Sequence, residues 1–302
     1  MFDDWKQNLS PRIKEAKFNI YRLKKNPLSL LGIGIIIFFI VQAIFAPLLA
    51  PPNRPDPFRV PTFFSTEPMP PSTEHPFGTT GPPGYYDVFY AVIWGTRISL
   101  RISFTVIISA LIVGISLGGV AGLYGGKIEE VLMRITDIFL ALPGLLLAMA
   151  IAAVLGRNIY NLINALIVVW WPVYARVIRA EILRVKSETF VEAARANGCS
   201  TGRIILRHIL PNVIFPILIV ASLDMGRVVL MAASLSFLGL GAQPGTAEWG
   251  LIISEGRNWM LRGMWWTTFF PGIAIFAFVL GWNFIGDAFR DILDPRVRRH
   301  MI

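Results

Sequence analysis

Residues 28–50 read LSLLGIGIIIFFIVQAIFAPLLA, a stretch without a charged side chain. A helix needs about 20 apolar residues to cross the roughly 30 Å hydrocarbon core of a bilayer, so this stretch is long enough to span a membrane. It is longer than the apolar core of a secretory signal peptide, and it follows 27 mostly polar and basic residues rather than a short leading segment. We therefore expect a transmembrane helix here and no cleaved leader.

The rest of the chain repeats this apolar pattern. Of its 302 residues, 54% are hydrophobic and 16% are charged, and the mean hydropathy is +0.59. These values are too apolar for a water-soluble domain of this length. Five further apolar runs lie at 99–123, 132–156, 160–176, 213–241 and 265–286. The sequence predicts an all-α, polytopic membrane protein with six transmembrane helices.

The basic residues predict the orientation of these helices. The N-terminal segment 1–27 and the loop after the fourth span each hold seven Lys or Arg residues, and the tail 289–302 adds four. Loops rich in Lys and Arg remain on the cytoplasmic side, so we expect both termini in the cytoplasm. The net charge of +9 is spread over loops rather than gathered in one patch, which argues against a nucleic-acid partner. The single cysteine, Cys199, excludes an intramolecular disulfide.

The remaining segments divide the chain around a membrane core. Residues 51–98 are expected to form an external loop, because 11 of the 21 prolines lie within 51–83 and no helical periodicity is visible there. Residues 99–288 form the expected five-helix core, which includes a cytoplasmic loop at 187–212.

Glycine and proline predict local features of the spans. The glycines at 114, 118 and 122 place a smooth strip on one helix face, which permits close approach of another helix. The pairs Pro143-Gly144 and Pro271-Gly272 predict kinks in the third and sixth spans. The loop 242–264, which mixes glycine, tryptophan and apolar residues, is expected to lie near the outer membrane surface.

No stretch of the sequence predicts bond chemistry. GISLG at 114–118 matches the pattern of a serine nucleophile turn, but it lies inside a span and no histidine is placed to activate Ser116. GGKIEE at 125–130 lacks the first glycine and the hydroxyl residue of a phosphate-binding loop. Three histidines and one cysteine at unrelated spacings predict no metal site. We expect no catalytic residue, cofactor or metal in this chain.

Two opposite charges lie three residues apart within the fifth apolar run. Asp224 and Arg227 share a helical face, where each unpaired charge costs about 2.5–3.5 kcal/mol on insertion scales. Two interpretations remain open. The pair either forms a structural ion pair packed against other helices or lines an aqueous path for a solute.

Residues 192–212 read EAARANGCSTGRIILRHILPN, a polar stretch between two apolar runs. Thr189 and Glu192 have the spacing of a capping box, Gly198 permits a left-handed helix end, and Ser200 can cap a second helix that Pro211 would stop. Helices this short are not stable alone in water. We therefore expect a helix-turn-helix that docks on a partner through its small residues, Ala193, Ala194 and Ala196.

This stretch resembles the EAA loop of the permeases of ABC importers, whose pattern is E-A-A-x3-G followed by I-x-L-P. Glu192, Ala193, Ala194 and Gly198 match it, and HILPN at 208–212 is similar to the form found in the peptide-import class. The resemblance continues at HPFGT (75–79), YARVIRAEILRV (174–185), SLSFLGLGAQP (234–244), EWG (248–250) and GDAFRDILDPR (286–296). Together these motifs resemble the second permease subunit of dipeptide and oligopeptide importers.

The resemblance implies a type I ABC importer transmembrane fold in the cytoplasmic (inner) membrane of a prokaryote. It implies a homologous permease subunit, two cytoplasmic ATPase subunits that bind ATP and Mg, and an external solute-binding protein as partners, besides membrane lipid. The residues expected to contact an ATPase subunit are Glu192, Ala193, Ala194, Arg195, Gly198 and Arg203.

Alternatives concern the cargo and the energy source. An oligosaccharide or nickel-chelate cargo fits the same class, and a secondary transporter driven by an ion gradient also has six spans. That transporter would have no need of a docking loop. The sequence departs from the importer pattern after HPFG, where it reads GTTGPPGYYD and lacks an acidic residue and an arginine. The contacts of this outer loop are expected to differ accordingly.

Overall fold

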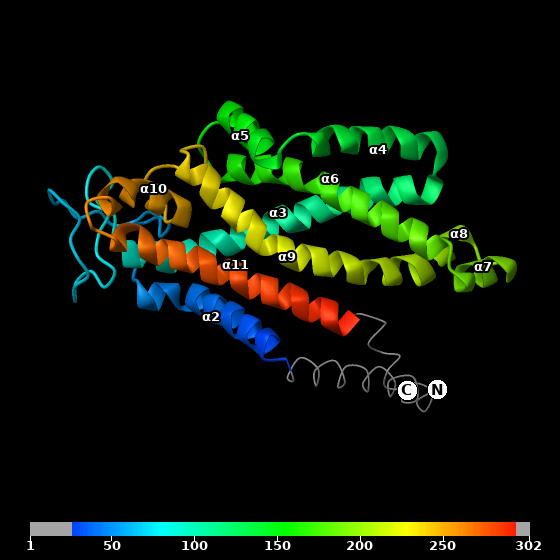
Figure 1. Cartoon of the computed structure of the whole chain (residues 1–302), viewed down its shortest axis with the longest axis horizontal. Coiled ribbons are helices and arrows are strands. Elements are labelled where there is room, and N and C mark those ends of the chain that lie inside the picture. The colour runs from blue at the N-terminus through cyan, green and yellow to red at the C-terminus, as the bar shows by residue number, and fades with distance from the viewer. Residues whose placement is uncertain (1–25, 294–302) are drawn as a thin grey trace.

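The computed structural model describes residues 26–293, so most of the basic N-terminal segment and of the tail lies outside the described residues. Within 26–293 the chain is helical, and its β-structure is confined to three isolated bridges. The helices are α2 (Pro27–Leu49), α3 (Val88–Tyr124), α4 (Gly126–Ala141), α5 (Gly144–Leu155), α6 (Ile159–Lys186), α7 (Thr189–Ala196), α8 (Thr201–Ile204), a π-helical turn η1 (Ile205–Ile209), α9 (Leu210–Phe237), α10 (Trp249–Met260) and α11 (Trp266–Leu293). Figure 1 shows the long helices side by side, with α10 and the loops at one end and α7 and α8 at the other.

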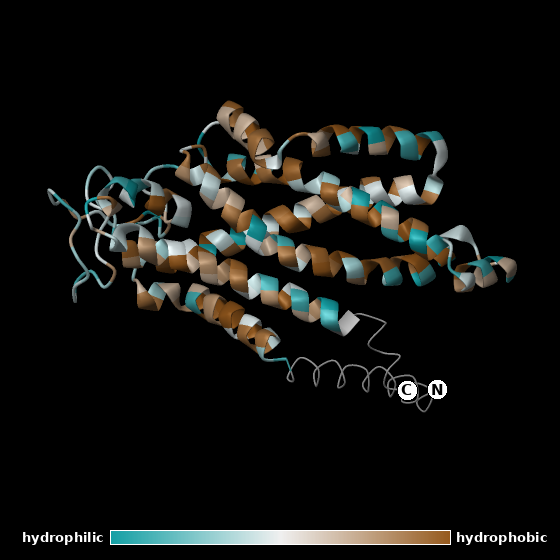
Figure 2. Ribbon diagram, in the orientation of Figure 1, coloured by the Kyte–Doolittle hydropathy of each residue, from teal (hydrophilic) through white to brown (hydrophobic). Residues whose placement is uncertain are grey.

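Six spans are present when one bent pair counts as a single span. Five helical segments are each long and apolar enough to cross a membrane, and α4 with α5 passes the same test as a pair bent by 88°. The predicted bend at Pro143-Gly144 is present, but it divides the run 132–156 into two helices instead of kinking one. Leu142 is extended (φ −86°, ψ 135°) because the ring of Pro143 disfavours helical geometry in the preceding residue. Figure 2 shows hydrophobic residues along most of α5 and interleaved hydrophilic residues on α4.

The helix pair α3 and α6 forms the centre of the molecule, and glycine allows its close packing. A Cβ atom added at Gly118 would lie 2.2 Å from the carbonyl oxygen of Ala175. One added at Gly114 would lie 2.5 Å from the Cβ atom of Tyr174. Both distances are shorter than van der Waals contact, so a larger residue cannot occupy either position without moving a helix. The predicted close approach of helices at this strip is confirmed.

Several helix boundaries differ from the sequence prediction. Helix α3 begins at Val88, 11 residues before the predicted start at 99, because Asp87 accepts the backbone N–H of Tyr90 and caps the helix. Helix α6 continues through Pro172 to Lys186, well beyond the predicted end at 176. The added turns of α3 include buried Val88 and Trp94, whereas those of α6 carry charged residues such as Arg184 and Lys186, which ended the predicted apolar run. Helix α11 is continuous through Pro271.

The outer loop packs on other loops at one end of the bundle. Its backbone bonds the segment before α10, with Val60 N–H donating to Gly245 and Ala247 N–H donating to Phe58. Nδ1 of His75 lies 2.7 Å from Oδ2 of Asp87, and both side chains are buried. The loop is therefore folded against the core rather than on its own.

Helix α10 was not predicted as a helix from the mixed composition of 242–264. Its first turn is held by Glu248, whose carboxylate accepts the backbone N–H groups of Gly250 (3.1 Å) and Leu251 (2.8 Å). Burial raises the pKa of Glu248, while these two donors oppose that shift. Trp249 is fully buried in a cluster with Phe39 and Phe278. A cap and one large anchor thus specify the short helix.

Candidate coupling loop and translocation path

The loop 187–212 folds into two short helices that project beyond the ends of α6 and α9 (Figure 1). Its first helix, α7, ends in a Schellman motif. The N–H of Cys199 donates to the carbonyl of Ala194 (3.1 Å), and the N–H of Gly198 donates to that of Arg195 (3.0 Å). Gly198 has φ +74°, so the predicted left-handed helix end is confirmed.

The predicted capping arrangement at the start of this loop is wrong. Glu188 occupies the N-cap position and Thr189 is the first helical residue, so Thr189 and Glu192 do not form a capping box. The carboxylate of Glu192 is exposed. Ser200 lies at the N-cap of α8 as predicted, but its side chain makes no capping hydrogen bond. Glu192 is therefore not explained by a capping role at the start of α7.

Pro211 does not stop the second helix, contrary to the prediction. Residues 201–237 form one helical segment, in which α8 passes through the wide turn η1 into α9. In η1 the N–H of Leu210 donates to the carbonyl of Ile205, five residues before it. A π-turn displaces the carbonyl with which a proline ring would clash. The coupling loop is therefore joined to α9 by an unbroken helix.

The two faces of the coupling helices differ in burial. Ala193, Arg195 and Arg203 are exposed together with Glu192 and Gly198, whereas Ala194 is buried against the core. Ala194 thus supports the fold of the loop, and the exposed small side chains of α7 are those of Ala193 and Ala196.

Phe190 is a surface feature that sequence reasoning missed. Its side chain is 42% exposed, and its ring lies 6.3 Å from that of His208. Leu206, 69% exposed, adds a second apolar side chain on the loop. Aromatic residues such as phenylalanine are enriched at protein–protein interfaces. The sequence signal that could have identified it is the position of Phe190 among the polar residues of the first turn of α7.

Asp224 and Arg227 are brought together as the sequence predicted. Oδ1 of Asp224 lies 3.3 Å from Nη1 of Arg227, and Oδ2 accepts the hydroxyl of Tyr174 on α6 (3.1 Å). The Asp224 side chain is 5% exposed, whereas that of Arg227 is 67% exposed. Asp224 thus has the contacts of a structural pair, and the role of Arg227 on the path stays a prediction.

Further charges within the spans join α4 to α6. Arg176 pairs with Asp137, and Arg179 pairs with Glu129. The first pair is about half exposed on both sides. Charges inside a membrane are costly against lipid, so this face of the subunit suits water or a protein partner. Sequence spacing could not identify these pairs, because their members lie on different helices.

The fold and the loop define a class of protein: a multi-pass membrane component with a projecting pair of short helices at the junction of two spans. Two known protein families match this chain. The family described as binding-protein-dependent transport system inner membrane component matches residues 110–299. The N-terminal TM domain of oligopeptide transport permease C matches residues 19–68.

Two relatives extend this match over nearly the whole chain. The dipeptide transport system permease protein of Alkalihalophilus pseudofirmus is 43% identical over 92% of this chain and 88% of its own length. The probable D,D-dipeptide transport system permease protein of Escherichia coli is 39% identical over 94% of each chain. Among solved structures, an inward-facing MetNI methionine ABC transporter aligns with a TM-score of 0.55 and 18% identity, over 68% of this chain and 97% of that chain.

The chain belongs to the family of binding-protein-dependent transport system inner membrane components. It is a multi-pass inner-membrane permease of an ABC importer with the type I transmembrane fold, and it works with other subunits of that importer. It is a transport subunit rather than an enzyme, and the ion-coupled alternative is not favoured.

Proposed function

We propose that this permease passes dipeptides and oligopeptides inward and is driven by ATP hydrolysis in partner subunits. The observation that carries this proposal is the projecting helix pair, which presents Glu192, Ala193 and the exposed ring of Phe190 at the end of the bundle. The peptide cargo rests on the relatives, which are named as dipeptide permeases. An oligosaccharide or nickel-chelate cargo is the alternative within the class.

The coupling element would act as a lever on two spans. Helix α7 follows α6 after two residues, and α8 continues through η1 into α9. A displacement of α7 and α8 by a closing ATPase subunit would therefore move α6 and α9 as attached rigid elements. Such rigid-body movement is a recognised way to switch a path between outward and inward openings.

The complete transporter in this proposal has four kinds of contact. A homologous permease completes the path, two cytoplasmic ATPase subunits bind ATP and Mg and receive the coupling loops, a solute-binding protein delivers cargo outside, and lipid surrounds the spans. The residues proposed for the ATPase contact are Glu192, Ala193, Gly198, Arg195 and Arg203. Ala194 would contribute by holding α7 against the core.

Site-specific cross-linking in native membranes tests the docking surface. In a Cys199→Ser background, Ala193→Cys places a thiol on the exposed face of α7, and we expect it to capture an ATPase subunit. Lys127→Cys is the matched control, because it is exposed near the turn between α3 and α4, at the same end of the bundle as α7 and α8 (Figure 1). Capture at Lys127 but not at Ala193 would contradict the assignment of the coupling loop.

Reconstituted uptake tests the coupling and the cargo. With all subunits present, Glu192→Lys is expected to abolish ATP-dependent peptide uptake while the complex still assembles, because it reverses an exposed charge at the docking surface. Peptides and sugars are compared as cargo at saturating binding protein. Uptake of a sugar but of no peptide would overturn the cargo assignment and leave the coupling assignment intact.

A further inference from the structure

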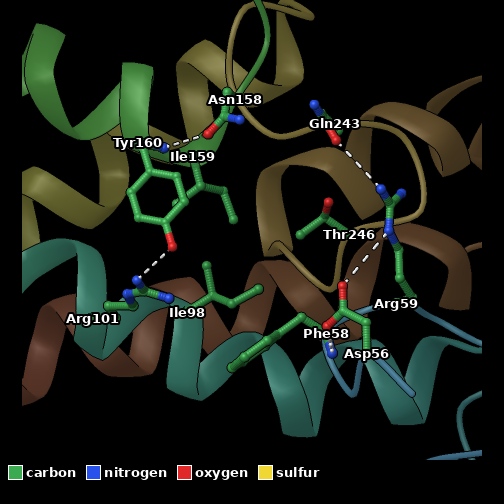
Figure 3. Close-up of a pocket in the computed structure, with 10 residues that line it drawn as sticks. All are labelled: Asp56, Phe58, Arg59, Ile98, Arg101, Asn158, Ile159, Tyr160, Gln243 and Thr246. Atoms are coloured by element: carbon green, nitrogen blue, oxygen red, sulfur yellow. Dashed lines mark hydrogen bonds and ion pairs between the residues drawn. The ribbon is translucent and has the colours of Figure 1, made fainter. Parts of the chain in front are cut away.

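A cavity of about 200 Å³, lined by both polar and apolar side chains, lies at the end of the bundle that carries the outer loop (Figure 3). Its walls come from α3, the beginning of α6, the outer loop and the segment before α10. Ile98, Ile159 and Phe58 supply apolar surface, while Arg101 and Arg59 supply two guanidinium groups. A cavity of this size suits the end of a peptide or a single amino-acid residue rather than a large solute.

The two arginines of this outer cavity differ in their partners. Arg59 donates to the carbonyl of Pro244 (2.6 Å) and to Oε1 of Gln243 (3.3 Å), and its Nε lies 3.9 Å from the carboxylate of Asp56. Its charge is therefore balanced within the protein. Arg101 donates one hydrogen bond, to the hydroxyl of Tyr160 (2.9 Å), and stacks on that ring at 5.1 Å.

Arg101 is exposed, so the rest of its guanidinium fork is open to water or to a ligand. No carboxylate of residues 26–293 lies within salt-bridge distance of it. Asn158 on the same cavity wall is the N-cap of α6, and a helix N-terminus adds positive potential. The guanidinium fork matches two oxygens of a carboxylate. The cavity consequently has the chemistry of a carboxylate site.

We propose that Arg101 binds the C-terminal carboxylate of the translocated peptide at the outer mouth of the path. This inference rests on the proposed peptide cargo. The C-terminal carboxylate is the one anionic group common to all free peptides, so its recognition would be independent of peptide sequence. The outer loop and the segment before α10 form part of the cavity wall, and the apolar side chains of Ile98, Ile159 and Phe58 would accept the last side chain.

The test uses the complete transporter in vesicles of zwitterionic lipid, with binding protein saturated by either a tripeptide or its C-terminal amide. For Arg101→Gln, uptake of the free acid is expected to fall roughly tenfold, as expected for loss of hydrogen bonds to a charged group, while uptake of the amide changes less than about twofold. Arg101→Lys keeps the charge but lacks the planar fork, so its uptake of the free acid is expected to lie between that of wild type and that of Arg101→Gln. Arg262→Gln, an exposed arginine on another outer loop, is the matched control and should leave both uptakes unchanged.

Basal ATPase activity of the same vesicles shows that each variant is assembled. An equal loss of acid and amide uptake in Arg101→Gln would overturn the inference, as would a loss that appears only when anionic lipid is added, since the oxyanion would then be a lipid headgroup. If the wild-type transporter imports peptides but the Arg101 variants lose acid and amide uptake equally, the Arg101 assignment fails and the peptide cargo stands. If it imports no peptide, the proposed cargo fails and this inference fails with it.

Discussion

Gly118 permits the closest approach of α3 to α6. Gly118→Ala would place a Cβ atom against the carbonyl of Ala175, and we expect a loss of about 1–3 kcal/mol, typical of overpacking. The opposing gain in helix propensity is only about 1 kcal/mol. Thermal unfolding of the purified transporter measures the change. Gly119→Ala, which meets no neighbour within 4 Å, should be neutral or stabilising, and equal effects of the two variants would contradict this account.

Gly198 is required for its backbone conformation rather than for space. An added Cβ atom would meet nothing within 4 Å, but φ is +74°, and a side chain in this region costs about 1–2 kcal/mol. Gly198→Ala is expected to weaken the end of α7 and to lower ATP-dependent uptake, and Gly198→Asn to have a smaller effect. Gly202→Ala, with open space and no positive φ, serves as control. Uptake in Gly198→Ala equal to wild type would count against the Schellman motif as a coupling feature.

At the scale of elements, ion pairs join α4 to α6 beside the edge-to-face contact of Phe139 with Trp171. Glu129→Arg places like charges together at Arg179, and we expect a stability loss of about 1 kcal/mol, since the pair is partly exposed. The exchange Glu129→Arg with Arg179→Glu should restore most of this loss in denaturation measurements. Glu130→Arg disturbs only the well-exposed pair with Arg134 and should have little effect. Failure of the exchange to rescue would show that α4 is held in another way.

At the scale of the whole molecule, the orientation remains a prediction that labelling can test. In a Cys199→Ser background, Asn53→Cys and Lys127→Cys place exposed thiols at opposite ends of the bundle. We expect a membrane-impermeant maleimide to label Asn53→Cys on intact cells, and Lys127→Cys only after the cells are opened, because positive loops stay in the cytoplasm. The reverse pattern would invert the proposed path and the assignment of the coupling loop.

The sequence by itself determined the membrane class, the apolar runs of the candidate spans and the presence of a short helix-turn-helix after the fourth run. Each depends on local properties: the length of an apolar run such as 28–50, the charge of the loops, and the spacing of Glu192, Ala193 and Gly198. The three glycines of α3 likewise predicted close packing, because the sequence alone shows that these positions lack a side chain. These features need no knowledge of which helices are neighbours.

Tertiary structure alone decided the contacts between distant segments. The pairing of Arg176 with Asp137, the inward face of Ala194 and the cavity around Arg101 depend on how helices are rotated and packed. The wide turn before Pro211 and the 88° bend at Pro143 depend on how a proline is accommodated, which can be by a bulge or by a break. The physical reason is the same in each case. A side chain's type follows from the sequence, but its partner is selected by the free energy of packing the whole chain.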